Sequence, residues 1–244
     1  MGRHGVKISE LDDFLNELKK YPNLYVEGVM SHLADADNPK SIKYTKEQTK
    51  KFDIGTEKII NAGFKPKYIH LAQSSGCVKV NSIYANTIRL GIALYGISPL
   101  EKSDYYYNKL CNLKPTLKLV STVSKIFELN TNESVSYGRI FIAKKKSRIG
   151  VLPIGYYEGI PRALSNIGKV KYNKSYLPIA GRICMNHTMI DVTDSKIKAN
   201  DEVLIISNNP TDKNSVKNIC KNNKLFSYWL LANLNQNIRR EITN

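Results

Sequence analysis

Tyr137 lies in a stretch, 134–141, in which a phenol stands between small side chains and is followed by glycine and arginine. A phenol has a pKa of about 10 in water, so it acts as a base at neutral pH only if cations or hydrogen bonds favour its anion. Arg139 and Arg162 are the candidates for that stabilisation. A tyrosine in a β-rich stretch is usually a core or surface filler. The stretch therefore predicts an acid/base tyrosine, with a filler role in the core or on the surface as the alternative.

Four further residues that could bind a ligand lie at the ends of strands predicted in the first half of the chain. They are His32, Ser74, Arg89 and Gly91. The carboxyl ends of parallel strands meet at one edge of a sheet and form its ligand face. A serine hydroxyl and the unobstructed N–H groups of a glycine-containing turn suit a phosphate. Each residue alone is weak evidence, because a histidine after a strand is more often a hydrogen-bonded structural residue. Together they predict a site for an anionic ligand.

The elements that position these residues alternate between helix and strand. Apolar residues at helical spacing predict two helices, the first capped by Ser9 and the second ended by Gly63 and Pro66. The helices are 7–20 and 42–62, and the strands are 24–30, 68–72 and 88–96. Such alternation is typical of βαβ units with a parallel sheet.

From residue 113 onward the chain changes to short β-branched and aromatic runs between turn signals. These runs are 117–129, 147–154, 169–190 and 202–206, and they are followed by a predicted helix at 216–221 and a predicted last strand at 229–234. We therefore predict an α/β domain over 1–111 and an all-β domain over 112–244.

The composition bears on which partners the chain could bind. The 244 residues include 37 Lys and Arg against 21 Asp and Glu, a formal charge of +16, which on its face suggests nucleic acid as a partner. The lysines are scattered among asparagines without a basic stripe or interleaved stacking aromatics, which favours a solvated surface over nucleic-acid binding.

Neither a membrane span nor a secretory signal is predicted, since no apolar run is long enough, and a cytoplasmic location is expected. The four cysteines are far apart and have no histidines at metal-ligand spacing, so we expect reduced thiols, no metal and no disulfide.

Eight short motifs follow one another along the chain: MGRHG (1–5), SHLADAD (31–37), LAQSSG (71–76), RLGIALYG (89–96), YGR (137–139), LPIGY (152–156), PRAL (161–164) and GRICMN (181–186). In this order and at these spacings they resemble the alanine racemase family of pyridoxal-phosphate enzymes. The resemblance implies an incomplete TIM-type β/α barrel followed by a C-terminal β domain. It also implies a head-to-tail homodimer in which each active site uses both subunits.

Members of that family interconvert L-alanine and D-alanine with pyridoxal 5'-phosphate as the cofactor and supply D-alanine for peptidoglycan. Racemisation removes the α-proton on one face of the amino acid and returns a proton on the other, so two bases flank the α-carbon. The family uses a lysine and a tyrosine from opposite subunits, and Tyr137 matches that tyrosine. A serine-type racemase is the alternative, because an apolar pocket hardly excludes an added hydroxyl.

The resemblance assigns cofactor contacts to residues of the first domain. Arg89 matches the arginine that faces the pyridine nitrogen of the cofactor. Its guanidinium keeps its proton, with a pKa above about 12, so the ring nitrogen stays neutral. Ser74, Gly91 and Ile92 match phosphate-binding positions. His32 matches a residue that lines the cofactor ring and is linked to Arg89.

Substrate contacts are implied in the same way. Arg3 matches an arginine that holds the substrate carboxylate and the cofactor's phenolic oxygen, a task suited to its planar fork of donors. The backbone N–H of Met185 belongs to the same carboxylate site. Asn186 stands where the family usually has aspartate. Tyr156 and Arg162 resemble residues of the channel through which substrate reaches the site.

The sequence departs from the family at the cofactor lysine, whose early motif has no match here. The C-terminal segment 236–240 also differs from the family pattern. We therefore expect a part of an alanine racemase that is inactive alone, and two alternatives stay open: a fragment of a longer gene product, or one half of a split enzyme that a separate N-terminal segment completes. A non-catalytic dimerisation or cofactor-binding module is the alternative. A partial barrel exposes strand edges, so we expect the first domain to be poorly stable unless another chain completes it.

Overall fold

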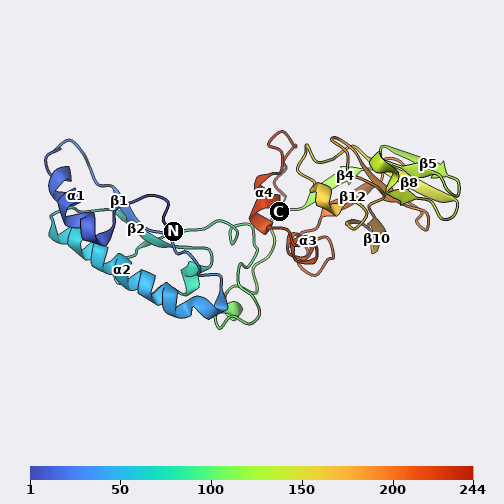
Figure 1. Cartoon of the computed structure of the whole chain (residues 1–244). Coiled ribbons are helices and arrows are strands. Elements are labelled where there is room, and N and C mark those ends of the chain that lie inside the picture. The colour runs from blue at the N-terminus through green and yellow to red at the C-terminus, as the bar shows by residue number, and fades with distance from the viewer. Residues whose placement is uncertain (244) are drawn as a thin grey trace. The chain divides into compact units, whose positions relative to one another are not determined.

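The computed structural model describes residues 1–243 and divides into two compact units, Met1–Leu113 and Lys114–Asn244. The division falls within the change of composition at 111–115. Figure 1 shows helices and short strands in the first unit and a β-rich second unit. The expected fold class, α/β followed by all-β, is confirmed.

The first unit is built on a parallel sheet of three strands in the order β1-β2-β3. These strands are β1 (Gly28–Met30), β2 (Tyr68–Gln73) and β3 (Thr87–Arg89). The long helix α2 (Ile42–Asn61) connects β1 to β2, as expected for a βαβ unit (Figure 1). In the described residues the sheet has three strands, fewer than the eight of a closed barrel.

Helix α2 forms where the sequence predicts it. Its buried side chains, Thr45, Thr49, Phe52 and Thr56, recur at helical spacing along one face. Phe52 joins a core that includes Ile69 and Leu71 of β2. The helix ends one residue before Ala62, and Gly63 follows with a φ of +98°, a conformation that glycine adopts readily.

The first helix differs from the expectation. A 3-10 turn, η1 (Ile8–Glu10), precedes α1 (Leu11–Leu18), so Ser9 lies inside the turn and does not cap the helix. Leu11 and Leu15 are the buried residues of α1. Asp12 at the start of α1 forms an ion pair with Lys58 of α2 at 2.6 Å.

Two predicted strands of the first unit are shorter than expected. The strand expected at 24–30 is regular only over Gly28–Met30, and the strand expected at 88–96 ends at Arg89. Beyond Gly91 the backbone N–H groups of Leu94 and Tyr95 donate to carbonyls three residues back, which folds the chain into successive turns. A strand prediction there is wrong because local turns satisfy the backbone.

The second unit contains three antiparallel sheets, ordered β10-β9-β12-β4, β11-β8-β5 and β6-β7. The strands are β4 (Leu119–Thr122), β5 (Lys125–Leu129), β6 (Ser134–Val135), β7 (Phe141–Ile142), β8 (Ser147–Leu152), β9 (Lys169–Tyr172), β10 (Ser175–Pro178), β11 (Thr188–Asp191) and β12 (Glu202–Ile206). Fully buried aliphatic side chains from β8, β11 and β12, among them Ile149, Ile190 and Ile206, form its interior.

The C-terminal segment is helical in two places. Helix α3 (Val216–Asn223) is capped by Ser215, whose Oγ accepts a hydrogen bond from the N–H of Asn218 at 3.3 Å. The strand expected at 229–234 is wrong, because Ser227–Ala232 forms helix α4. Leu230 and Leu231 are both buried, a consecutive pair that does not fit the alternating burial of a half-exposed strand.

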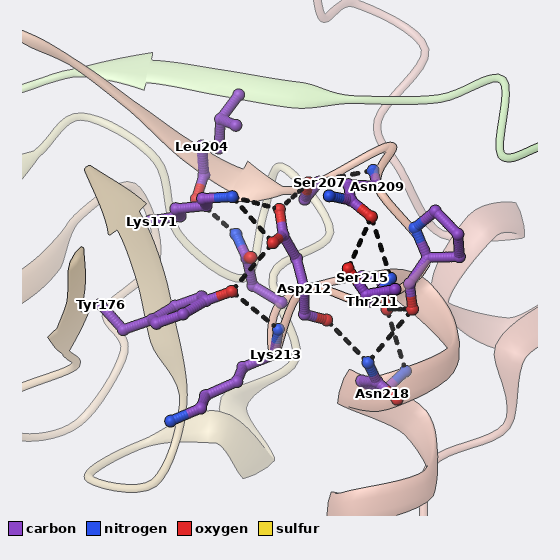
Figure 2. A network of polar contacts seen from close by, with 12 residues as sticks. Lys171, Tyr176, Leu204, Ser207, Asn209, Thr211, Asp212, Lys213, Ser215 and Asn218 are labelled. Carbon is purple, nitrogen blue, oxygen red and sulfur yellow. Dashed lines mark hydrogen bonds and ion pairs between the residues drawn. The ribbon is translucent and has the colours of Figure 1, made fainter. Parts of the chain in front are cut away.

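A polar network fixes the chain between β12 and α3 (Figure 2). The carboxylate of Asp212 accepts hydrogen bonds from Lys171 Nζ at 2.7 Å, Tyr176 Oη at 3.0 Å and Ser207 Oγ at 2.6 Å. Its backbone carbonyl accepts a further bond from Asn218 Nδ2 in α3 at 2.7 Å. The network therefore joins two strands of one sheet to the helix that follows it.

The four cysteines, Cys77, Cys111, Cys184 and Cys220, are free. Within residues 1–243 no cluster of three or more histidine, cysteine or acidic side chains is placed to hold a metal ion. No helix in that part of the chain is both long and apolar enough to cross a membrane.

Candidate active site

Arg89 is the centre of a cluster at the carboxyl ends of the parallel strands. Its Nη2 lies 3.0 Å from Nδ1 of His32 and donates to the carbonyl of Ser31 at 2.7 Å. Its Nη1 contacts Nδ1 of His70 and donates to the His70 carbonyl at 3.0 Å. The guanidinium thus connects the end of β3 with β2 and with the residues after β1, and the link from His32 to Arg89 is present.

The cluster fixes the protonation of both histidines. Burial lowers the pKa of His32, and the charges of Arg89, Arg3 and the chain's amino terminus lower it further. Burial and then the charge of Arg89 lower the pKa of His70. Burial also lowers the pKa of Arg89, but a guanidinium keeps its proton in proteins. Because arginine only donates, both Nδ1 atoms are acceptors and each imidazole is neutral with its proton on Nε2.

Ser74 and the turn after Arg89 form a second feature of this edge. The Ser74 hydroxyl is buried and accepts hydrogen bonds from the N–H of Gly91 at 2.9 Å and of Ala93 at 3.2 Å. The N–H of Ile92, between them, has no acceptor among residues 1–243. The Ser74 O–H and the Ile92 N–H therefore remain as donors, which suits an anionic group.

Arg3, by contrast, lies in an exposed N-terminal stretch without regular structure. Its positive charge contributes to the lowered pKa of His32, after burial and the charge of Arg89. No hydrogen bond joins the Arg3 side chain to another residue of the described chain.

Tyr137 lies in the second unit, in the short turn η5 (Tyr137–Arg139) between β6 and β7. Its side chain is 69% exposed. The expected stabilisation of the Tyr137 phenolate by an arginine is not observed in the described chain, because neither Arg139 nor Arg162 donates a hydrogen bond to the Tyr137 hydroxyl. Arg139 Nε instead donates to Ser134 Oγ at 3.0 Å. Arg162 is the first residue of the short 3-10 turn η6 (Arg162–Leu164) and is exposed.

The backbone around Tyr137 is strained. Ser136 has φ 71° and ψ 174°, a region that only glycine occupies readily and that costs other residues about 1–3 kcal/mol. Strained backbone of this kind is concentrated at active sites and ligand clamps. This strain favours the acid/base interpretation of Tyr137, and the exposure of its side chain disfavours a filler role in the core but not one on the surface.

Met185 and Tyr156 lie on two loops that touch. The N–H groups of Tyr156 and Tyr157 donate to the carbonyls of Cys184 at 3.0 Å and of Met185 at 2.9 Å. Gly155 permits this approach, because a Cβ at that position would lie 2.2 Å from the Cys184 carbonyl oxygen. The Met185 N–H has no acceptor in the described chain, so it remains available to a ligand.

Glu158 fastens the same two loops. One carboxylate oxygen accepts from the N–H of Gly155 at 2.7 Å, and the other accepts from Asn186 Nδ2 at 3.0 Å. The Glu158 carbonyl accepts from the N–H of Asn235, and Asn235 Nδ2 donates to the Tyr157 carbonyl at 3.2 Å. The C-terminal turn is thereby attached to the loop that carries Tyr156.

The sequence analysis missed two members of these clusters, His70 and Glu158. His70 lies inside β2 rather than after it, so the end-of-strand pattern did not select it. Glu158 lies two residues after Tyr156, but its partner Asn186 is 28 residues away. The sequence signal that could have selected His70 is its position inside the strand predicted at 68–72, since a polar residue within a buried strand calls for a partner.

Comparison with known proteins agrees with this architecture. Residues 116–242 match the family model described as alanine racemase, C-terminal domain, and residues 1–99 match the alanine racemase, N-terminal domain. The alanine racemase of Citrifermentans bemidjiense is 34% identical over 86% of this chain. Alanine racemase 2 of Caldanaerobacter subterraneus subsp. tengcongensis is 33% identical over 98% of it.

The solved alanine racemase of Bacillus anthracis with bound L-Ala-P superposes with a TM-score of 0.85 and 28% identity, over 96% of this chain and 60% of that chain. The fold is thus that of a β/α-barrel protein with a C-terminal β domain. The chain belongs to the alanine racemase family. It spans 55% and 61% of the lengths of the two relatives named above.

Proposed function

We propose that this chain forms part of an alanine racemase, which interconverts L-alanine and D-alanine in the cytoplasm and supplies D-alanine for peptidoglycan. The observation that carries the proposal is the pair of sites at the parallel-strand ends, the Arg89 cluster and the Ser74 turn. The bound L-Ala-P of the Bacillus anthracis enzyme is consistent with an alanine-related substrate.

Pyridoxal 5'-phosphate is the cofactor that these residues fit. The Ser74 O–H and the N–H of Ile92 would hold its phosphate beside Gly91, because both donors are free of other acceptors. Arg89 would face the pyridine nitrogen, and His32 would line the ring. When bound, the cofactor supplies an electron sink that makes the α-proton of the amino acid removable.

Arg89 would keep that electron sink weak. Its guanidinium retains its proton, so it would donate a hydrogen bond to the ring nitrogen without transferring a proton. The Nδ1 atoms of His32 and His70 hold the guanidinium in place. A weak sink would limit side reactions.

Residues of the second unit, together with Arg3 of the first unit, would handle the substrate. Tyr137 would remove or return the proton on one face of the α-carbon. The N–H of Met185 and the guanidinium of Arg3 would bind the carboxylate, with Asn186 beside it. Tyr156 and Arg162 would line the channel that leads to the site.

A homodimer with shared active sites is proposed from the family resemblance, and the lysine base would come from residues outside the 244 of this sequence. Two features of the first unit support further strands beside it. β1 and β3 are both edge strands, and the apolar side chains of Met30, Ile88 and Leu90 on or beside them are exposed. Unpaired edges of a parallel sheet accept further strands, so additional β/α segments, of the same protein or of another chain, fit there.

The test follows exchange of the alanine α-proton into D2O by NMR, with the chain, the cofactor and a polypeptide that carries the family's lysine motif. We expect exchange only when that polypeptide is present. Tyr137→Phe should then lower the rate by about 100-fold or more, since a positioned acid/base group contributes about that much. Tyr157→Phe, a change at another exposed tyrosine of the second unit, is the matched control and should leave the exchange rate unchanged.

Full exchange by the chain alone would refute the need for a second polypeptide, and an active Tyr137→Phe variant would refute the role of the tyrosine. The missing match to the lysine specifically favours one other function, a non-catalytic dimerisation or cofactor-binding module. Cofactor binding without any exchange in the completed mixture would support that module instead.

A further inference from the structure

Ser136, the residue before Tyr137, has a backbone conformation that glycine adopts freely and serine does not. Its φ of 71° and ψ of 174° place it outside every region that side chains with a Cβ favour. The two residues after Tyr137, Gly138 and Arg139, also have positive φ angles, 71° and 50°. The chain path on both sides of the tyrosine is therefore unusual, and that path sets the direction of the tyrosine side chain.

A short hydrogen bond holds Ser136 in this conformation. Its Oγ donates to the carbonyl oxygen of Arg182 at 2.5 Å and lies 3.6 Å from Cys184 Sγ. Gly181 makes the approach possible, because a Cβ there would lie 2.7 Å from the Cβ of Ser136. The turn before Tyr137 is thus fixed directly to the segment 181–184.

Asn166 provides a second tie between the same two segments. Its Nδ2 donates to the carbonyl of Ile140 at 2.7 Å, just after the tyrosine turn. Its Oδ1 accepts from the N–H of Gly181 at 2.5 Å. The tyrosine turn is therefore fastened to 181–184 on both sides of Tyr137.

The segment 181–184 leads directly into Met185, whose N–H is proposed to bind the substrate carboxylate. A base and a carboxylate site that act on one small amino acid must be held in a fixed relation, since small displacements slow catalysis strongly. The Tyr137 side chain is mostly exposed, so packing does not orient it. The backbone of Ser136 and its bond to Arg182 supply the constraint.

We propose that Ser136 is a positioning residue, which aims the Tyr137 phenol through its strained backbone and ties it to the carboxylate-binding loop through the Arg182 carbonyl. This proposal rests on the proposed role of Tyr137 as a base. It predicts that relief of the strain improves folding and weakens catalysis at the same time.

The test replaces Ser136 by glycine and measures backbone 15N order parameters in the whole chain. In Ser136→Gly the unfolding temperature should stay at or above that of the parent, because glycine accepts the conformation. The order parameters of 137–139 should fall from about 0.85 to below about 0.6. Asn173→Gly, at another positive-φ residue in the turn between β9 and β10, is the matched control and should leave 137–139 unchanged.

A second variant, Ser136→Ala, separates the strain from the hydrogen bond. Alanine keeps the Cβ and loses the hydroxyl, so its unfolding temperature should fall below that of the parent while 137–139 become mobile. In the completed enzyme both variants should lower kcat for racemisation by about 10-fold to 100-fold, with KM for alanine changed less than threefold.

Unchanged order parameters at 137–139 in both variants would overturn the proposal, whatever Tyr137 does. An unfolding temperature of Ser136→Gly below that of Ser136→Ala would also overturn it, because the strain would then be absent. The proposed function fails on a different measurement, parent-like racemisation by Tyr137→Phe, so the two failures are distinguishable.

Discussion

Asn186 Nδ2 donates a 3.0 Å hydrogen bond to the carboxylate of Glu158, and the other oxygen of that carboxylate binds the N–H of Gly155. The Asn186 amide therefore donates to the same carboxylate that binds the backbone of the loop carrying Tyr156. An aspartate at position 186 would place a second carboxylate beside the first. The asparagine thus has a structural consequence in this chain, because its amide donates where an aspartate could not.

Asn186→Asp should destabilise the second unit at neutral pH. In this variant two carboxylates replace the hydrogen-bonded pair of Glu158 and Asn186, and they repel one another. At an exposed site this should lower the free energy of unfolding by about 0.5–1 kcal/mol. The loss should shrink as the pH falls and the carboxylates become protonated. Thermal unfolding between pH 4 and pH 8 measures both effects.

The double variant Glu158→Gln with Asn186→Asp is the control for that experiment. It restores an amide and a carboxylate at the two positions with their order reversed, so the pair can bond again. Recovery of most of the lost stability would show that the two side chains act on one another. A double variant no more stable than Asn186→Asp would show that the loss arises elsewhere.

Asp212 should stabilise the second unit in a pH-dependent manner. Burial on its own raises the pKa of this carboxyl, but the hydrogen bonds from Lys171, Ser207 and Tyr176 outweigh it and hold the pKa below its ordinary value. A pKa lower in the folded than in the unfolded chain means that the unfolded chain binds the proton more readily. The stabilisation is therefore complete above about pH 4–5 and is lost as the pH falls through the folded pKa.

Asp212→Asn should accordingly lower the free energy of unfolding at pH 7 by about 1–3 kcal/mol, the range for hydrogen bonds to charged groups. It should also flatten the fall of stability between about pH 5 and pH 2. Asp194→Asn is the matched control: its 3.3 Å ion pair with Lys145 is exposed, so its loss should change stability by less than about 0.5 kcal/mol. Equal effects of the two variants would contradict the importance of the network in Figure 2.

Regular elements with a long periodic pattern were predictable from the sequence. Helix α2 was expected over 42–62 and extends over Ile42–Asn61, because four buried side chains repeat along one face. The expected strand 68–72 corresponds to β2 (Tyr68–Gln73), and its parallel pairing with both neighbours is confirmed. In these places local propensity and tertiary burial agree.

Short apolar runs were not predictable in the same way. Residues 227–232 carry too few positions to separate a strand from a buried helix, and packing decides in favour of α4. Contacts between distant residues leave no local pattern either. Lys79 and Asp104 form a buried ion pair at 2.5 Å across 25 residues, and the sequence analysis did not single out either residue.

In the Arg89 cluster, the pKa values of His32 and His70 should both lie below the ordinary value for histidine. Burial is the larger cause for both His32 and His70, and the charge of Arg89 adds to it. Arg89→Met should therefore raise both pKa values towards about 6.5 without restoring them fully. Lys67→Met is the control, because it removes a different cation of the same unit, one that lies over the Tyr68 ring. It should leave the pKa values of His32 and His70 unchanged.

The sign for stability follows from the same shifts. Because the folded pKa values are lowered, the unfolded chain binds more protons below about pH 6.5, so the first unit should lose stability as the pH falls from 7 towards 5. NMR titration of the imidazoles, with 15N shifts to report the Nε2–H form, measures both the pKa values and the tautomer. Histidines that titrate alike in the parent and in Arg89→Met would show that the guanidinium does not act on them, and that the neutral Nδ1 acceptors derived from the geometry are wrong.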